Sequence, residues 1–297
     1  MIKRTLHFSN PAHLSVKNEQ LCIELKNEER TTTTVPVEDL GMVVVEHPQI
    51  TFTMGVLDAL MANKVALITC DKNYLPNGML LPFEANSEQN KRIRTQLDAS
   101  TPLKKQLWQQ TIKQKIQNQA NVLDKLGLNA TRLLALVNKV QSGDSGNLEA
   151  QAAAYYWDTL YGHNFTRGRS LESPNAQLNY GYAILRSMVA RALVASGMLP
   201  TIGIFHANKY NAFCLADDIM EPFRPFVDWV VMHLEGIQDL DIGLTREQKI
   251  ELLKLPQIDV VVNDAKSPMF HAISKTTASL FKCFDGELRK ISYPTFE

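Results

Sequence analysis

The feature that most constrains the fold of this chain is a change in hydrophobic period near residue 85. Before it, apolar residues alternate with polar ones at 21–25 and form a short continuous run at 42–46, which is typical of strands. After it, apolar residues recur mainly at helical spacing. The sequence therefore predicts an α+β protein, with a β-rich domain at 1–85 and a larger, mainly α-helical domain at 86–297.

Local signals within the first domain support this assignment. The segments 13–16 and 21–25 alternate around a turn-prone 17–20, which predicts a hairpin, and Pro36 suits an edge strand. The domain carries no glycine-rich phosphate loop and no catalytic cluster. We therefore expect it to be structural or to mediate dimerisation.

Composition excludes several classes of protein. The formal net charge is zero, so any nucleic-acid surface must be local rather than a field of the whole molecule. The four cysteines are scattered singly, which argues against a zinc ribbon or a disulfide scaffold and for a reducing compartment. The N-terminus lacks the apolar core of a signal peptide, and Arg186 and Arg191 interrupt the most apolar helix candidate. We expect a cytoplasmic protein without a membrane span.

The segment 200–225 carries the strongest chemical pattern. A small, apolar run leads to His206, and Asp217, Asp218 and Glu221 follow at helical spacing, so these carboxylates share one face. Crowded carboxylates repel one another unless a cation lies among them, and a divalent metal with His206 as a nitrogen ligand is the simplest such cation. A hydrogen-bonded core histidine beside a solvated acidic helix face fits the same pattern.

Two further groups of polar residues lie on predicted helices. Glu149 stands in the first turn of a helix over 148–161 that Asn147 is expected to cap. There the helix dipole favours an ionised carboxylate, which suits a metal ligand or simply completes the helix end. Asn175 and Asn179 recur at helical spacing on a long apolar helix. Buried amides need partners, so they either orient the site or tie loops.

Basic residues gather locally despite the neutral total. Between residues 88 and 125 there are eight basic and three acidic side chains, which form either a phosphate-contacting stripe or a solvated surface. The loop near residue 168 adds two arginines, whose forked guanidinium groups suit phosphate oxygens. The candidate phosphate contacts, which the resemblance described below makes candidate DNA contacts, are Arg92, Lys104, Lys105, Arg167, Arg169 and Lys209.

Three segments in fixed order carry a resemblance to a known family. They are GNLEA at 146–150, PNAQLNYGYAIL at 174–185 and GIFHANKYNAFCLADDIMEPFRP at 203–225. With them, the chain resembles the CRISPR-associated integrases, the catalytic subunits of the spacer-acquisition complex, and in particular the branch of type II systems. The resemblance spans nearly the whole chain.

The resemblance implies particular site residues. It implies that Glu149, His206 and Glu221 bind the catalytic metal, with Asp218 in a supporting role that Asp217 is also placed to take. One departure is that many members have aspartate where this chain has Glu221. Glutamate is one methylene longer, so its reach to the metal differs.

The implied activity is a Mg²⁺- or Mn²⁺-dependent transesterification that inserts short DNA fragments into a CRISPR array. The implied partners are double-stranded DNA, as fragment and repeat, a second copy of the chain, and the small second subunit of the acquisition complex. The RNA-guided effector nuclease is a further candidate partner. The alternatives are a non-enzymatic DNA-binding scaffold of the same complex, and a metallohydrolase that acts on a small phosphoester.

Overall fold

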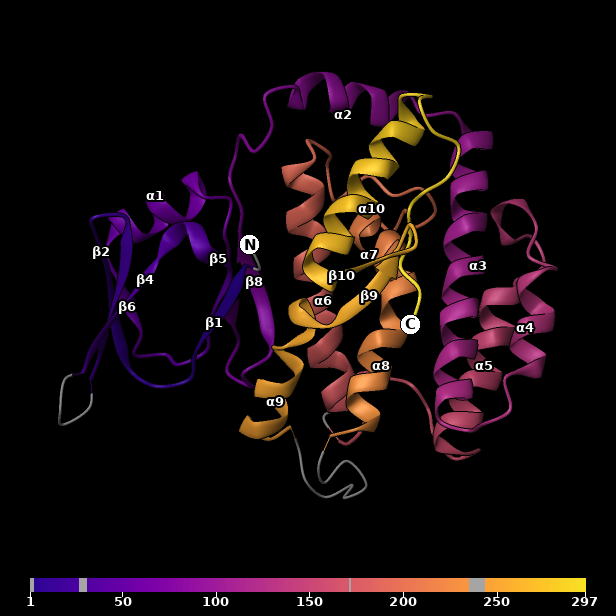
Figure 1. The fold of residues 1–297 in the computed structure, drawn as a ribbon, viewed down its shortest axis with the longest axis horizontal. Helices are drawn as coiled ribbons and strands as arrows, with labels where there is room; N and C mark the ends of the chain where they lie inside the picture. Colours follow the sequence, from indigo (N-terminus) through magenta and orange to yellow (C-terminus); the bar gives the residue numbers. More distant parts are fainter. Residues whose placement is uncertain (1–2, 27–30, 171, 235–243) are drawn as a thin grey trace. The chain divides into compact units, whose positions relative to one another are not determined.

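The computed structural model describes residues 3–26, 31–170, 172–234 and 244–297. The chain divides into two compact units, Met1–Ser87 and Glu88–Glu297. Strands dominate the first unit and helices the second (Figure 1), so the predicted α+β class is confirmed.

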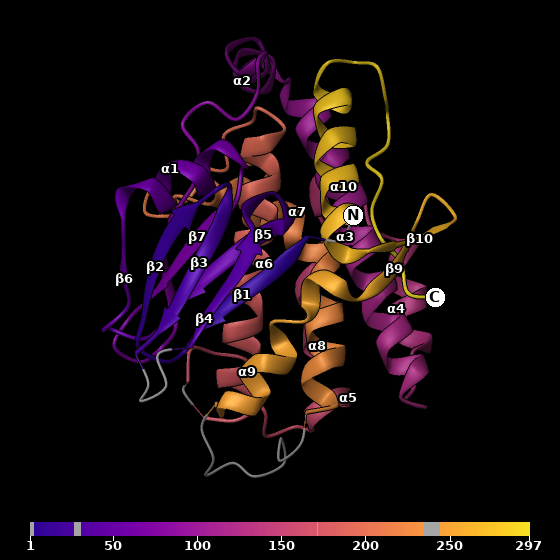
Figure 2. The same ribbon diagram turned by 60° about the vertical axis from the view of Figure 1, so that its left-hand side comes forward.

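The described residues of the N-terminal unit form two four-stranded sheets (Figure 2). The first has three parallel strands and an antiparallel edge, in the order β1 (Arg4–Phe8), β5 (Leu40–Val45), β7 (Ala66–Cys70) and β8 (Pro76–Leu80). The second runs in the order β4 (Thr32–Pro36), β3 (Gln20–Leu25), β2 (Ala12–Lys17) and β6 (Thr51–Phe52). The predicted edge position of Pro36 is therefore confirmed, because β4 ends the second sheet.

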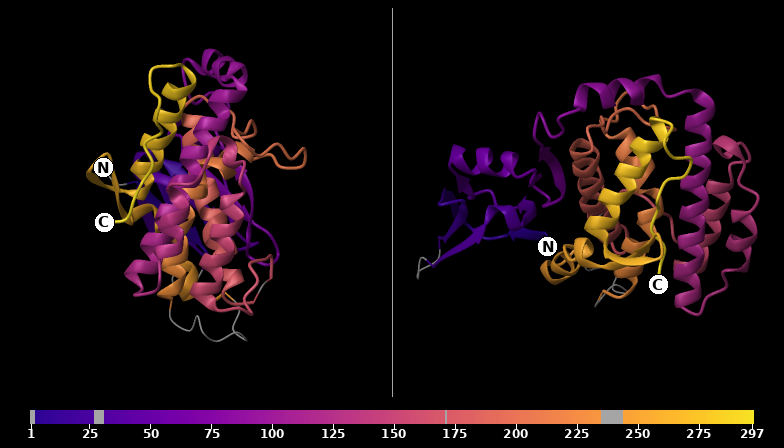
Figure 3. Two further views of the ribbon diagram at one scale, coloured as in Figure 1. Left: turned by 90° about the vertical axis from the view of Figure 1, so that its right-hand side faces the viewer. Right: turned by 45° about the horizontal axis from the view of Figure 1, so that its top comes forward.

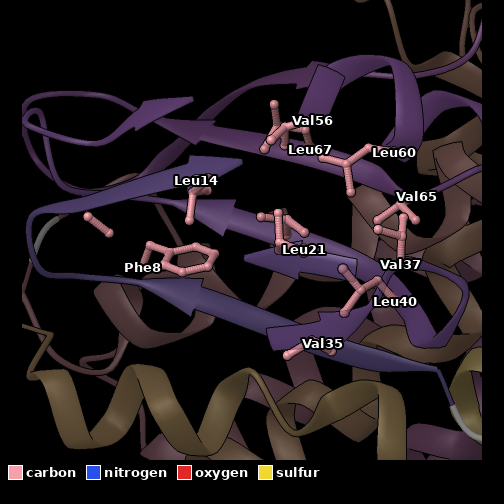
Figure 4. Packing of buried hydrophobic residues seen from close by; sticks show 12 residues of the cluster. Phe8, Leu14, Leu21, Val35, Val37, Leu40, Val56, Leu60, Val65 and Leu67 are labelled. Atoms are coloured by element: carbon pink, nitrogen blue, oxygen red, sulfur yellow. The ribbon is translucent and has the colours of Figure 1, made fainter. Parts of the chain in front are cut away.

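Both sheets and one helix contribute to a single apolar core. Figure 4 shows Leu40 of the first sheet and Leu21 of the second among the side chains of this core. Val56 and Leu60 of α1 (Met54–Ala62) belong to the same cluster. The alternation predicted from the sequence thus places apolar side chains on the faces that pack together.

The predicted hairpin is confirmed as β2 and β3. Lys17 pairs with Gln20 across a two-residue turn, and Asn18 and Glu19 both have positive φ, of 51° and 61°. This is the backbone of a type I′ turn, whose twist matches that of the flanking strands.

The C-terminal unit is mainly helical in its described residues. Its long helices are α3 (Thr101–Lys125), α6 (Asn175–Ala195) and α10 (Met269–Phe284). The shorter ones are α2 (Gln89–Asp98), α4 (Thr131–Val137), α5 (Leu148–Tyr161), α7 (Cys214–Met220), α8 (Arg224–Met232) and α9 (Arg246–Leu252). The helices α4 and α5 pack against α3, and α7, α8 and α10 pack against α6 (Figure 3). A Cβ at Gly181 of α6 would overlap the Val227 side chain of α8, so a glycine permits this close crossing.

One strand pair in this unit departs from the expected helical pattern. The strands β9 (Asp259–Val262) and β10 (Ala265–Pro268) form an antiparallel hairpin. Asn263 and Asp264 make its turn, with φ values of 51° and 59°. The valine run followed by Asn-Asp is the sequence pattern that could have predicted this hairpin. In the part of the chain that the structure describes, no helix has the length and apolar character needed to cross a bilayer.

Candidate metal centre

One buried carboxylate organises the loop that carries His206. Asp218 of α7 is fully buried. Its Oδ2 accepts hydrogen bonds from the backbone N–H groups of Ile204 and Phe205, at 2.7 and 3.0 Å. Its Oδ1 accepts the backbone N–H of His206 at 3.2 Å and lies 2.5 Å from the ring Nδ1 of the same residue. The imidazole is therefore held through Nδ1, which leaves Nε2 as the nitrogen available to a ligand.

A glycine makes this close approach possible. A Cβ added at Gly203 would overlap the carbonyl oxygen of His206 and lie 2.8 Å from Oδ2 of Asp218. The small residue before the histidine is therefore required by the packing of the loop against α7.

An aromatic stack supports the other side of His206. Trp108 of α3 is buried, and its ring stacks on Phe205 at 4.2 Å between centroids with 3° between planes. The imidazole of His206 meets the Trp108 ring edge-on, at 5.6 Å and 86°. Phe205 itself is 51% exposed, so this stack ends at the protein surface.

Glu149 lies at the start of α5, as expected, but a different residue caps the helix. Asp144 accepts the backbone N–H of Leu148 at 2.9 Å and that of Glu149 at 3.0 Å. The predicted cap, Asn147, makes no capping hydrogen bond and has a φ of 49°. The prediction of Asn147 was wrong because the tight turn before the helix brings Asp144 back to the free N–H groups.

Lys115 brings the two predicted glutamate ligands together. Its Nζ lies 2.6 Å from Oε1 of Glu149 and 2.6 Å from Oε2 of Glu221. Glu221 is buried, and its Oε1 forms an ion pair with Nε of Arg224 at 3.0 Å. The two carboxylates, which are distant in sequence, therefore converge on one ammonium group.

Neighbouring opposite charges keep Lys115 and Glu221 ionised despite their burial. Burial disfavours the ammonium of Lys115, but the carboxylates of Glu221 and Glu149 outweigh it and raise the pKa of Lys115. Burial likewise disfavours the Glu221 carboxylate, yet Arg224 and Lys115 lower its pKa below the usual value. The hydrogen bond that the His206 ring donates to Asp218 raises the pKa of His206 against the opposing effect of burial.

The other predicted supporting residues lie elsewhere. Asp217 pairs with Arg186, at 2.6 and 2.8 Å, and accepts a hydrogen bond from Asn211 at 2.7 Å. Of the two aspartates that the sequence left open, Asp218 contacts His206, whereas Asp217 anchors the loop to α6, because successive helical residues point about 100° apart.

Asn175 and Asn179 tie a loop, which is one of the two alternatives that the sequence left open. Their side-chain oxygens accept hydrogen bonds from Arg167, at 2.9 and 2.8 Å. Asn175 also binds the backbone of Thr166 and Gly168. These contacts favour the loop-tying alternative for both amides.

The basic candidates separate into two groups. Arg167 is held by the two asparagines, and Arg92 pairs with Glu88 at 2.9 Å and donates to the Ser196 carbonyl, so both serve internal contacts. Lys104 is half-buried, whereas Lys105, Arg169 and Lys209 are exposed. Lys115 is one of the eight basic residues between 88 and 125. Its position between the carboxylates was not predicted, because burial of a lysine has no local signal.

The donors present fit a divalent metal in chemistry. Two carboxylates and an imidazole are the ligand types of a Mg²⁺ or Mn²⁺ site, and the buried Oε2 of Glu221 makes no hydrogen bond of regular geometry. Within the described residues, however, no three His, Cys, Asp or Glu side chains come close enough to hold an ion. The carboxylate pair converges on Lys115 instead, so the three-residue site remains a prediction.

Comparison with known proteins assigns the family. The model of the family described as CRISPR associated protein Cas1 matches residues 6–241. CRISPR-associated endonuclease Cas1 of Neisseria meningitidis serogroup C (strain 8013) is 42% identical over 281 residues, which cover 94% of this chain and 91% of that protein.

Solved structures share the fold. A casposase bound to integration product aligns with a TM-score of 0.78 and 18% identity, covering 98% of this chain and 93% of that chain. A chain of a Cas6-RT-Cas1–Cas2 complex aligns with a TM-score of 0.73 and 19% identity, covering 98% of this chain and 36% of that chain. The family model and the Neisseria relative show that the chain belongs to the Cas1 family of CRISPR-associated endonucleases, the DNA-cleaving and DNA-integrating enzymes of spacer acquisition.

Proposed function

We propose that Glu149, His206 and Glu221 hold one divalent ion, Mg²⁺ or Mn²⁺, and that this centre joins short DNA fragments to the CRISPR array. The observation that carries the proposal is the convergence of Glu149 and Glu221 on one cationic group. The orientation of His206 by Asp218 supports it, because metal-binding histidines usually donate their second ring nitrogen to a carboxylate.

The joining reaction is a transesterification at phosphorus. The 3′-hydroxyl of the fragment forms a bond to phosphorus and loses its proton, while the bond to the leaving 3′-oxygen breaks and that oxygen gains a proton. When bound, the ion polarises the phosphate and offsets the charge that develops on it.

Neighbouring residues hold the side chains of the three proposed metal ligands in place. Asp218 holds Nδ1 of His206 and so reserves Nε2. Arg224 engages Oε1 of Glu221 and leaves Oε2 directed to the cation site. Asp144 fixes the backbone of Glu149 at the helix start. Each ligand is therefore positioned by a partner outside the reacting groups.

The partners follow from the family and the similar structures. We propose that the chain works as a homodimer, with double-stranded DNA and the small Cas2 subunit as partners, in the cytoplasm. The type II branch and contact with the effector nuclease belong to the same proposal. The casposase bound to integration product and the Cas1–Cas2 complex support DNA and subunit binding. The exposed Lys105, Arg169 and Lys209 are the basic side chains best suited to phosphate contact.

The test is strand transfer by single variants. The protein is incubated with the small subunit, a short duplex, Mn²⁺ and a supercoiled plasmid that carries a leader and repeat. We expect Glu149→Gln, His206→Ala and Glu221→Gln each to lower joined product by at least about a hundredfold, since each removes a ligand of the metal. Glu247→Gln on the exposed face of α9 is the matched control.

Folding of each variant is checked by circular dichroism and by its unfolding temperature. Normal transfer by all three folded variants would remove this centre from the mechanism. Duplex binding without any joined product in the unmodified protein would favour the non-enzymatic scaffold instead.

A further inference from the structure

Lys115 occupies a place that a long, flexible cation rarely takes. It lies on α3, two helical turns from Trp108, and its side chain is 11% exposed. Both of its carboxylate contacts are 2.6 Å long. The contact with Glu149 is a charge-assisted hydrogen bond, and the contact with the buried Glu221 is a close ion pair.

The carboxylates would otherwise repel each other. Glu221 keeps Arg224 as a second cationic partner, on Oε1. For Glu149, in contrast, Lys115 is the cation that the structure records in ion-pair contact within the described residues. The ammonium of Lys115 is thus what draws Glu149 towards Glu221, because an unpaired pair of close carboxylates is unfavourable in a buried setting.

The same two carboxylates are the ones that a shared metal ion would need. Carboxylate oxygens lie about 2.0–2.1 Å from Mg²⁺, which is closer than the ammonium lies now. An ion held by Glu149 and Glu221 would need the space and the carboxylate charge that the ammonium of Lys115 now takes. Two cations cannot share that position.

We infer that Lys115 and the divalent ion are alternative occupants of the Glu149–Glu221 pair. Lys115 is then a positioning residue that keeps the pair assembled and sets the metal affinity, since the ion must displace the ammonium in order to bind. This inference rests on the proposed function, because it takes Glu149 and Glu221 as metal ligands. It goes further by assigning a competitor to the metal from within the chain.

The test measures Mn²⁺ binding to the full-length protein by electron paramagnetic resonance of the free ion. Lys115→Met removes the charge at similar length and is expected to tighten Mn²⁺ binding about tenfold or more, because the ion no longer breaks charge-assisted hydrogen bonds. Lys115→Arg keeps a competing cation and is expected to stay within about threefold of the unmodified protein on the same reasoning. Lys105→Met, on the exposed part of α3, is the control.

Stability provides a second readout. In EDTA the unfolding temperature of Lys115→Met should fall, since the buried Glu221 and the half-buried Glu149 both lose a cationic partner. Saturating Mn²⁺ should then raise the unfolding temperature of Lys115→Met by more than it raises that of the unmodified protein. Unchanged or weaker Mn²⁺ binding by folded Lys115→Met would overturn the inference.

A measurement on the unmodified protein covers the case in which Lys115→Met does not fold. Amine labelling followed by peptide mass spectrometry should show Lys115 becoming more reactive on saturation with Mg²⁺, while exposed Lys105 does not change. Constant labelling of Lys115 at saturation would overturn the inference.

Mn²⁺ binding by Glu149 and Lys115 variants distinguishes failure of the proposed metal centre from failure of the competition by Lys115. If Mn²⁺ binds equally well to Glu149→Gln and the unmodified protein, the proposed centre is wrong and the inference falls with it. If binding requires Glu149 but is indifferent to Lys115, the centre stands and only the competition is refuted.

Discussion

Replacing Asp218 with asparagine tests how the His206 loop is held. Each carboxylate oxygen of Asp218 receives two donors, among them the backbone N–H groups of Ile204, Phe205 and His206. Asparagine offers one acceptor oxygen and one NH₂ donor. In either orientation of the amide, the NH₂ group therefore faces groups that are themselves donors.

The magnitude follows from these contacts. A buried donor left without an acceptor costs about 1–3 kcal/mol. With the NH₂ in place of Oδ2, two backbone N–H groups lose their acceptor. With the NH₂ in place of Oδ1, the N–H of His206 loses its acceptor, and Nδ1 must give up its proton to accept from the amide. We expect Asp218→Asn to lower the free energy of unfolding by about 2–4 kcal/mol.

The second orientation also damages the proposed metal site. If Nδ1 becomes an acceptor, the ring proton moves to Nε2, which then cannot bind an ion. Loss of such a supporting carboxylate typically costs about 10–100-fold in metal affinity. In addition, Asp218 raises the pKa of His206, so metal binding to the unmodified protein should strengthen as pH rises through that raised value. In Asp218→Asn this midpoint should move to lower pH.

The assay uses urea unfolding and Mn²⁺ binding together. All three tryptophans, Trp108, Trp157 and Trp229, lie in the C-terminal unit, so their fluorescence follows that unit alone. Asp264→Asn, in the exposed turn of the β9–β10 hairpin, is the matched control. An unfolding midpoint and a pH profile of Mn²⁺ binding that both match the unmodified protein would refute this account of Asp218.

Two further substitutions distinguish residues that stabilise the fold from residues that support metal binding. Asp217→Asn weakens the pair with Arg186 and should lower the free energy of unfolding by about 1–3 kcal/mol, while Mn²⁺ affinity measured on the folded fraction stays within about twofold; a loss of Mn²⁺ affinity as large as that of Asp218→Asn would contradict the separate roles. Gly203→Ala pushes a Cβ against the His206 carbonyl and should cost about 1–3 kcal/mol by overpacking; unchanged urea unfolding would show that the loop adapts freely.

Local chemistry explains why some elements could be predicted. The turn at Asn18 and Glu19 depends on residues adjacent in sequence, and so does the alternation of the strands that flank it. The turn at Asn263 and Asp264 has the same character, yet the helical pattern on both sides concealed it. The spacing of apolar residues predicted secondary structure correctly in long segments, but it did not predict the short strand pair β9–β10, which lies between helices.

For the proposed site, the sequence by itself determined the candidate residue types and their segments: a histidine after an apolar run, and acidic residues at helical spacing behind it. Only the tertiary structure decided that Asp218 rather than Asp217 holds His206, because which face of α7 is buried depends on what packs against it. It alone also decided that Lys115 lies between Glu149 and Glu221. That position depends on the packing of α3 against α5 and against the turn after α7. Contacts between segments so far apart in the chain cannot be predicted from local sequence patterns.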